Sequence, residues 1–462
     1  MCGVPNHAAL ANRVVRGAAN VAFRREFKTI GVLFFLAPFI TLLSPQATVP
    51  LFILLSAGSV TIALIHGQTV RELFRFDPGF TLFVAVTGYL LINATWSLDP
   101  SRAFGKAVWF AIVSLMAFGA SRAIRTWHKQ QIGVASVAFL AGLTAGIAFV
   151  LFEVATNQLL LRLLYNVFPI TRPDSLKALV MHGDQIFSIK SSELNRNVAV
   201  MLLLLWPALL CFGRLRDKRW RLLGIVALCL AAATAIMLSK HDTSKVGLIF
   251  SAIAFLIALL WPTATRRAVW ITWCLAFVLV VPLSSLALKA QLHQTEWLPV
   301  SARARVILWA YTAEQIPAAP LFGIGLTSTR KLDMDPATRL EAVKPEGYVY
   351  AWRAGSHAHN EFLQAWYELG AVGVILLIAA GSSVIGYVGR LSPPIQAFML
   401  AHLTAFLVIT AFSWGMWQSW LMAVAGLAAI YAALAVSFWP TEGPAPDERG
   451  RSAASLEPPS AA

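Results

Sequence analysis

Long apolar runs follow one another along most of the chain, and they constrain its fold more than any other sequence feature. A helix of about 20 apolar residues spans the hydrocarbon core of a bilayer. The chain is 58% hydrophobic and 13% charged, and a soluble domain carries about twice that charged fraction. We therefore predict an all-α integral membrane protein with about twelve transmembrane helices, and we exclude a soluble multidomain enzyme. The predicted spans are residues 30–43, 48–65, 79–96, 104–120, 132–156, 198–213, 221–239, 246–262, 268–288, 362–388, 396–413 and 417–439.

The distribution of Lys and Arg predicts the orientation of these spans. With residues 1–29 in the cytoplasm, 20 of the 37 Lys and Arg residues lie in inner segments and only four in short outer stretches. The other 13 lie in two long outer loops, 157–197 and 289–360, where the positive-inside rule has little force. We therefore expect a membrane domain over 30–439 with both termini inside and the larger loop before the tenth helix. Residues 1–29 read as a basic N-terminal segment rather than a cleaved signal, and 440–462 as a disordered tail.

The net charge of +15 is compatible with nucleic-acid binding, but no nucleic-acid motif accompanies it. Membrane topology together with an anionic substrate explains it better. Three of the four cysteines (Cys211, Cys229 and Cys274) lie in or beside apolar runs, and none lies in the long loops. No disulfide or metal framework is therefore indicated.

Four basic residues of the outer loops, Lys190, Arg196, Arg303 and Arg305, lie close to apolar runs. The planar guanidinium of arginine matches phosphate oxygens bidentately. Such a set at the outer membrane–water boundary suits a lipid phosphate or pyrophosphate. The alternative is that these side chains contact lipid headgroups in general or extend from the apolar region to water.

A pair of histidines, His357 and His359, precedes the tenth span, and Asn360 is a suitable N-cap for it. A metal pair is one interpretation, but no Asp, Glu or Cys stands at ligand spacing. Imidazole is also the usual general base near neutral pH. The polar residues of the following helical stripe are expected to face a water-filled cavity. They are Glu361, Gln364 and Glu368.

Two ionisable residues, Glu153 and His402, lie near the middle of predicted spans. Each is either a proton-relay or ion site or a buried, hydrogen-bonded structural group.

Three sequence elements carry a resemblance to a known family. Arg305 is followed by Trp309 and then by Pro320-Leu-Phe-Gly-Ile-Gly325. His359-Asn360 is followed after nine residues by Gly370 and after two more by Gly373. The third and weaker element is Glu193-Leu-Asn-Arg-Asn197, which enters a span. With the twelve spans, these elements resemble the O-antigen ligase/O-antigen polymerase family of bacterial membrane glycosyltransferases.

The resemblance implies transfer of a glycan from undecaprenyl pyrophosphate to an acceptor hydroxyl, on the periplasmic side of the inner membrane. By position, His359 matches the family's catalytic histidine, and Arg305 and Arg196 match its pyrophosphate-binding residues. His357, Asn360, Trp309, Gly370 and Gly373 are then supporting residues. The implied reaction inverts the anomeric centre, and it requires no metal, cofactor or nucleotide because pyrophosphate is a good leaving group.

The chain departs from the family pattern after the seventh span, where Ser239-Lys240 replaces the usual Ser-Arg. Lys240 keeps the charge without the planar fork, so it is a secondary phosphate-binding candidate. Arg303 is expected to replace or assist Arg305, since both could reach a site from an irregular loop.

Several functions remain open. A ligase would use lipid A–core as its acceptor, a polymerase would use another polysaccharide, and a third relative class modifies protein hydroxyls. A lipid-linked glycan flippase would also need basic cavity residues, but it would show charge through the depth of the bundle.

Overall fold

The computed structural model describes residues 26–168, 178–213, 217–335 and 344–439. Nearly all of the expected N-terminal segment, and the whole of the expected tail at 440–462, lie outside the described residues. Residues 26–29 already belong to the first helix.

Twelve helices in the described part of the chain are long and apolar enough to cross a membrane, so the predicted all-α membrane fold is confirmed. The first and last residues of the helices differ from those of the predicted apolar runs where polar residues cap a helix. The fourth helix begins at Pro100 rather than at residue 104, because the Asp99 side chain accepts a hydrogen bond from the Arg102 amide at 3.2 Å. The helices are Glu26–Leu43, α2 Thr48–Ile65, α4 Pro78–Asn93, α5 Pro100–Arg125, α6 Lys129–Ala155, α8 Asn195–Phe212, α9 Lys218–Leu238, α10 Asp242–Leu260, α11 Pro262–Lys289, α15 Glu361–Val388, α16 Pro393–Phe412 and α17 Ser419–Phe438.

Helix α8 lies inside the bundle, and its side chains from Asn197 to Cys211 are all buried. It packs against α6, α9, α16 and α17, so it forms the centre around which the other helices are arranged. Short elements connect several of the spans. They are η1 Pro45–Ala47, α3 Val70–Leu73 and η2 Ala94–Trp96.

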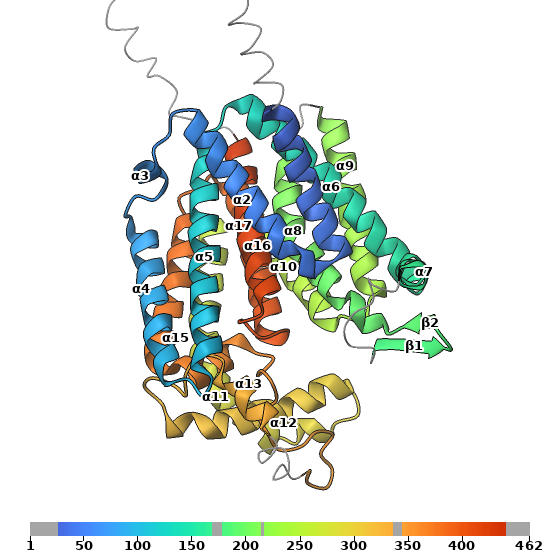
Figure 1. Ribbon diagram of the computed structural model, residues 1–462, viewed down its shortest axis with the longest axis vertical. Coiled ribbons are helices and arrows are strands. Elements are labelled where there is room, and N and C mark those ends of the chain that lie inside the picture. Colours follow the sequence, from blue (N-terminus) through green and yellow to red (C-terminus); the bar gives the residue numbers. More distant parts are fainter. Residues whose placement is uncertain (1–25, 169–177, 214–216, 336–343, 440–462) are drawn as a thin grey trace, which may run out of the picture.

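Both long loops contain secondary structure and lie at the same end of the bundle (Figure 1). The first contains α7 Leu159–Val167, an antiparallel hairpin of β1 Leu179–His182 and β2 Gln185–Ile189, and η5 Ser191–Leu194. The second contains η6 Leu292–Gln294, α12 Val300–Gln315, η7 Ile316–Ala318 and α13 Ser328–Met334. The expectation that Arg303 and Arg305 stand on an irregular loop is therefore wrong, because both belong to α12.

Helix α15 is interrupted at Gly370, which has φ +64° and ψ −169°. The segment from Pro320 to Gly325 lies against this break and pairs with its main chain. The amides of Ile324 and Gly325 donate to the carbonyls of Tyr367 and Glu368, each at 3.0 Å. The amides of Ala371 and Val372 donate to the carbonyls of Pro320 and Leu321 at 2.9 and 3.2 Å. The Pro320–Gly325 motif thus satisfies main-chain groups that the break leaves without helical partners.

Helix α4 completes this junction. The Asn93 amide nitrogen donates to the Phe322 carbonyl at 2.9 Å, and its oxygen accepts from the Leu326 amide at 2.7 Å. The Tyr89 hydroxyl donates to the Leu369 carbonyl. The second long loop is therefore fixed to two transmembrane helices at once.

We predict that Gly370→Ala destabilises the protein by about 1–3 kcal/mol or more, since a non-glycine residue at positive φ is strained. A β-carbon at Gly370 would also lie 2.5 Å from the Leu321 carbonyl. The matched control is Gly386→Ala in the same helix, where nothing lies within 4 Å. This change should raise stability by about 0.5–1 kcal/mol. Thermal unfolding in detergent measures both, and equal midpoints for the two variants would contradict the account.

Candidate active site

The turn from His357 to Asn360 joins the second long loop to α15. The Asn360 side-chain oxygen accepts hydrogen bonds from the amides of Phe362 and Leu363, both at 3.1 Å. Asn360 therefore caps the helix as predicted. His359 has φ +53°, a conformation that few residues other than glycine adopt. The turn is thus a defined structure rather than a flexible connection.

The hydrogen bond of His359 fixes its tautomer. Its Nδ1 lies 2.7 Å from the Ser413 carbonyl oxygen, and because a carbonyl can only accept, Nδ1 carries the proton. The Nε2 lone pair of the neutral ring is then available to accept a proton. Burial lowers the pKa of His359 below 6.5 and the charge of Arg305 lowers it further, while the Ser413 carbonyl opposes both. His359 is therefore neutral at pH 7.

His357 packs against His359, with ring centroids 4.0 Å apart and planes at 45°. Burial lowers the pKa of His357 to about 3, with smaller effects from His359, Arg305 and Arg330. A β-carbon at Gly415 would lie 2.9 Å from the His357 β-carbon, so a glycine at 415 allows this close approach. The two imidazoles thus form one compact pair of neutral rings.

The charge of Arg305 affects the pKa of both histidines of this pair. Arg305 stands on α12, and its charge lowers the pKa of His241, His357 and His359 alike. Among the described residues, Arg305 forms no ion pair with a carboxylate. Asp242 has only a weaker, opposing effect on the pKa of Arg305, which burial lowers. A partly buried guanidinium without a bonded carboxylate is suited to bind an anionic ligand.

Arg303 has no such effect on the histidines. Residues two apart on a helix point in different directions, so Arg303 and Arg305 do not share a face of α12. The expectation that Arg303 joins Arg305 is not supported by the helical geometry.

Trp309 lies one turn after Arg305 on α12 and supports the histidine turn. Its indole nitrogen donates a hydrogen bond to the Ala358 carbonyl at 2.8 Å. Residues four apart share one helix face, so Arg305 and Trp309 are directed to the same side. This explains why the two residues occur together in the sequence motif.

The loop between α16 and α17, residues 413–418, is the part of the site that the sequence did not indicate. Ser413 accepts from His359, Gly415 packs on His357, and Trp414 stacks on His241 with ring centroids 5.0 Å apart. The Trp417 indole donates to the Glu368 carboxylate at 2.5 Å. The tryptophans of the 413–418 loop form a cluster in the sequence, but tryptophans are also typical of any membrane–water boundary.

Arg196, on the first turn of α8, is linked to the 413–418 loop by contacts with aromatic rings. Its guanidinium lies 5.5 Å from the centroid of the Trp420 ring, which is 5.1 Å from that of Trp414. Cations bind to the faces of aromatic rings in this way. By contrast, Lys190 and Lys240 are exposed, and in the described part of the chain neither has a contact that places it beside the histidines.

Three further cations extend the positive surface. Arg102 and Lys106 stand on α5 and Arg330 on α13, and the Lys106 ammonium donates to the Ser419 hydroxyl at 2.8 Å. The charge of Arg330 acts on Arg102, on Lys106 and on His357.

The polar stripe of α15 does not face water, so that expectation is wrong. Glu361, Gln364 and Glu368 are 7%, 3% and 0% exposed. Glu368 accepts from the Thr329 amide at 3.1 Å as well as from Trp417, because the loops around 326–329 and 413–418 cover this side of the helix. Glu361 lies beside the Met416 main chain, and neither of its oxygens has a hydrogen bond of good geometry to a described residue.

The two ionisable residues within spans have different surroundings. The Glu153 carboxylate accepts from the amides of Leu160 and Leu161 at 2.8 and 3.1 Å, so it holds the first turn of α7. This supports the structural interpretation over a proton relay. His402 is buried in α16, and its Nδ1 has no hydrogen-bond partner among the described residues.

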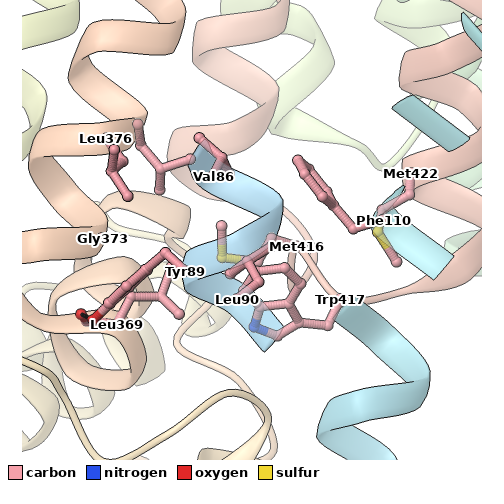
Figure 2. Close-up of a pocket in the computed structure, with 11 residues that line it drawn as sticks. Val86, Tyr89, Leu90, Phe110, Leu369, Gly373, Leu376, Met416, Trp417 and Met422 are labelled. Carbon is pink, nitrogen blue, oxygen red and sulfur yellow. Dashed lines mark hydrogen bonds between the residues drawn. The ribbon is translucent and has the colours of Figure 1, made fainter. Parts of the chain in front are cut away.

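An apolar cavity of about 90 Å³ lies behind Trp417. Figure 2 shows its lining by α4, α5, α15, α17 and the 413–418 loop, with Tyr89, Phe110 and Met416 among the side chains. A lining with so few polar atoms suits hydrocarbon rather than sugar. Neither histidine of the 357–360 turn is among the residues that line this cavity.

Comparison with known proteins matches residues 227–378 to the family described as O-antigen ligase. This segment of the chain is similar to O-antigen ligases. A protein of Rickettsia conorii that is named as a candidate polysaccharide ligase is 21% identical over 417 residues, which cover 85% of this chain and 93% of the relative. The predicted family resemblance is thereby confirmed.

The O-antigen ligase match covers about a third of the chain, from α9 into α15. It includes Arg305, the histidine pair and Gly373, whereas Arg196 and the 413–418 loop lie outside it. The site geometry therefore joins the matched segment to elements on both sides of it.

We predict that Trp309→Phe lowers stability by about 1–3 kcal/mol, because the buried Ala358 carbonyl loses its donor. The loosened histidine turn should also lower any activity that depends on His359. Trp297→Phe is the matched control, since Trp297 is 76% exposed and its replacement should have little effect. Thermal unfolding and an activity assay on both variants test this, and an unaltered Trp309→Phe protein would exclude the supporting role.

Proposed function

We propose that this chain is a glycosyltransferase that moves a glycan from undecaprenyl pyrophosphate to a hydroxyl of lipid A–core, on the periplasmic side of the bacterial inner membrane. The observation that carries the proposal is the neutral His359, with its Nε2 lone pair available, near Arg305, which forms no ion pair with a carboxylate of the described residues. The family match supports a ligase, and the acceptor and donor are part of the proposal.

In the proposed reaction, His359 Nε2 takes the proton of the acceptor hydroxyl while its oxygen forms a bond to the anomeric carbon. The bond from that carbon to the pyrophosphate oxygen breaks, and its electron pair leaves with the pyrophosphate. Arg305 stabilises the negative charge that develops there, an effect that can contribute several kcal/mol. One direct displacement of this kind inverts the anomeric centre, and no metal ion takes part.

The other cations would hold the donor headgroup. The Arg196 guanidinium lies over the ring of Trp420, and the Lys106 ammonium donates to the hydroxyl of Ser419, so both cations contact the first turn of α17. The charge of Arg330 affects both Lys106 and His357. These cations would bind the pyrophosphate together with Arg305, and Lys190, Lys240 and Arg303 would contribute only to the general positive field.

The periplasmic assignment rests on two observations. Both long loops lie at one end of the bundle (Figure 1). The Lys and Arg residues of the short loops are concentrated at the other end, which favours the cytoplasm for that end and for both termini.

A polymerase of the same family would use the same donor and a second glycan as acceptor. A flippase is disfavoured, because the buried Glu153 is occupied in holding α7 rather than free in the bundle. Lipopolysaccharide gels of a strain lacking the gene separate these functions. Loss of the long-chain ladder with accumulation of lipid-linked polymer supports the ligase, whereas an intact ladder with missing exopolysaccharide supports the polymerase.

We predict that His359→Gln reduces the rate of transfer by roughly 10²–10⁴-fold, and that it fails to restore the ladder in the deletion strain. His182→Gln is the control, because His182 is exposed on the hairpin and should restore it fully. Transfer from a synthetic undecaprenyl-pyrophosphate-linked sugar by purified protein gives the rates. Full complementation by His359→Gln would refute the proposed base.

The pH profile of kcat/KM should reflect the lowered pKa of His359. Burial lowers the pKa of His359, so the neutral base persists to a lower pH than an ordinary imidazole allows, and activity should fall at a lower pH than the usual value of 6.5 would give. Removing the nearby charge in Arg305→Gln should raise this pKa, and the residual activity should then fall at a higher pH. A wild-type profile already half-maximal at pH 7 would contradict the neutral, buried histidine.

A further inference from the structure

Helix α7 of the first long loop has an exposed face made only of large apolar side chains. They are 38–65% exposed. The residues are Leu159, Leu160, Leu163, Leu164 and Val167. Phe168, which follows the helix, is 56% exposed. An apolar face of this size in water would be unfavourable.

The polar side chains of α7 point the other way, toward the hairpin. The Arg162 guanidinium donates to the Phe187 carbonyl at 3.0 Å. The Asn166 amide bonds to both main-chain groups of Ile186, at 2.8 and 3.2 Å. Leu161 and Tyr165 pack on the apolar residues of the hairpin. The exposed apolar face is therefore not a disordered surface but one side of a folded unit, which we name the α7–hairpin unit (residues 159–167 and 179–189).

Two buried side chains fix the position of this unit on the bundle. Glu153, which is fully buried at the end of α6, accepts from the first amides of α7. Gln158, 2% exposed, donates to the Ile189 carbonyl at 3.0 Å. The direction of α7 relative to α6 is thus set by buried polar contacts.

Figure 1 shows α7 end-on, so its axis is roughly perpendicular to the long axis of the bundle. The last turn of α6, which α7 follows in the chain, also exposes an apolar side chain, since Phe152 is 42% exposed. Helix α9, which packs on α6, exposes Leu230 and Leu238. The neighbouring surface is in contact with lipid, because these helices span the membrane.

We propose that α7 is an interfacial helix whose apolar face inserts among the acyl chains of the membrane leaflet on the side of the two long loops. Its occupant is the lipid leaflet itself, because α7 follows and contacts α6, and both α6 and its neighbour α9 are membrane-spanning helices with exposed apolar side chains. An amphipathic helix lying in the interface plane has this arrangement of apolar and polar faces.

Insertion of α7 would also affect the candidate active site. The α7–hairpin unit leads through η5 directly into Arg196 at the start of α8. Insertion of α7 would fix the depth of Arg196 relative to the lipid headgroups. This consequence, unlike the insertion itself, rests on the proposed function.

Spin labels test the insertion directly in the full chain, reconstituted in phosphatidylethanolamine–phosphatidylglycerol vesicles with the native cysteines replaced. Labels at 160 and 163 should collide with oxygen and be protected from a water-soluble nickel complex. A label at Gln185, exposed on the hairpin, should show the reverse. Accessibility of label 163 to nickel would overturn the proposal. Protection of label 163 from both reagents would also overturn it, because a second protein chain would then cover α7.

A second experiment compares the transfer kinetics of the double variant Leu163→Glu/Leu164→Glu with those of the wild type. Loss of leaflet insertion should raise the KM for a long-chain polyprenyl donor by on the order of tenfold, while kcat with a short-chain, water-soluble donor stays unchanged. A fall in kcat with both donors would assign α7 a role in catalysis instead. If the wild type transfers no glycan, the proposed function fails, but the spin-label result still decides the position of α7.

Discussion

Main-chain amides and carbonyls in apolar surroundings require hydrogen-bond partners, and the interruption of α15 at Gly370 depends on this requirement. The break leaves amides and carbonyls outside the helical ladder, and the Pro320–Gly325 segment pairs with them. Since Asn93 of α4 bonds to the same segment, the second long loop is fixed to the bundle at this point. The position of α12, and with it Arg305, follows from that attachment.

The electrostatics of the site follow from where the loops place charge. Arg305 is partly buried and lies beside imidazoles that burial keeps neutral, and no described carboxylate forms an ion pair with it. Glu368, the fully buried acid of α15, is bonded to Thr329 and Trp417. The candidate site therefore combines a cation that has no ion pair with a described carboxylate and a proton acceptor, and the proposed transfer from an anionic carrier to a hydroxyl requires both.

The sequence predicted the spans and the Asn360 cap because both depend on local information. Span length follows from bilayer thickness, and Asn360 caps the helix that begins at the next residue. It did not predict the role of residues 413–418, since their partners Glu368, His359, His357 and His241 lie 49 or more residues away along the chain. The burial of Glu361 was missed for the same reason, because the loops that cover it come from distant segments. The expectation that Arg303 and Arg305 stand on an irregular loop was wrong, because the sequence of α12 does not have the apolar length that marks the spans.

The most direct test of the account is a structure of the protein bound to a phosphonate analogue of an undecaprenyl-pyrophosphate-linked sugar, which cannot be cleaved. The account predicts that the pyrophosphate group lies within hydrogen-bond distance of Arg305, with the anomeric carbon facing the Nε2 side of His359. An analogue bound at the opposite end of the bundle, or with its pyrophosphate away from Arg305, would contradict it.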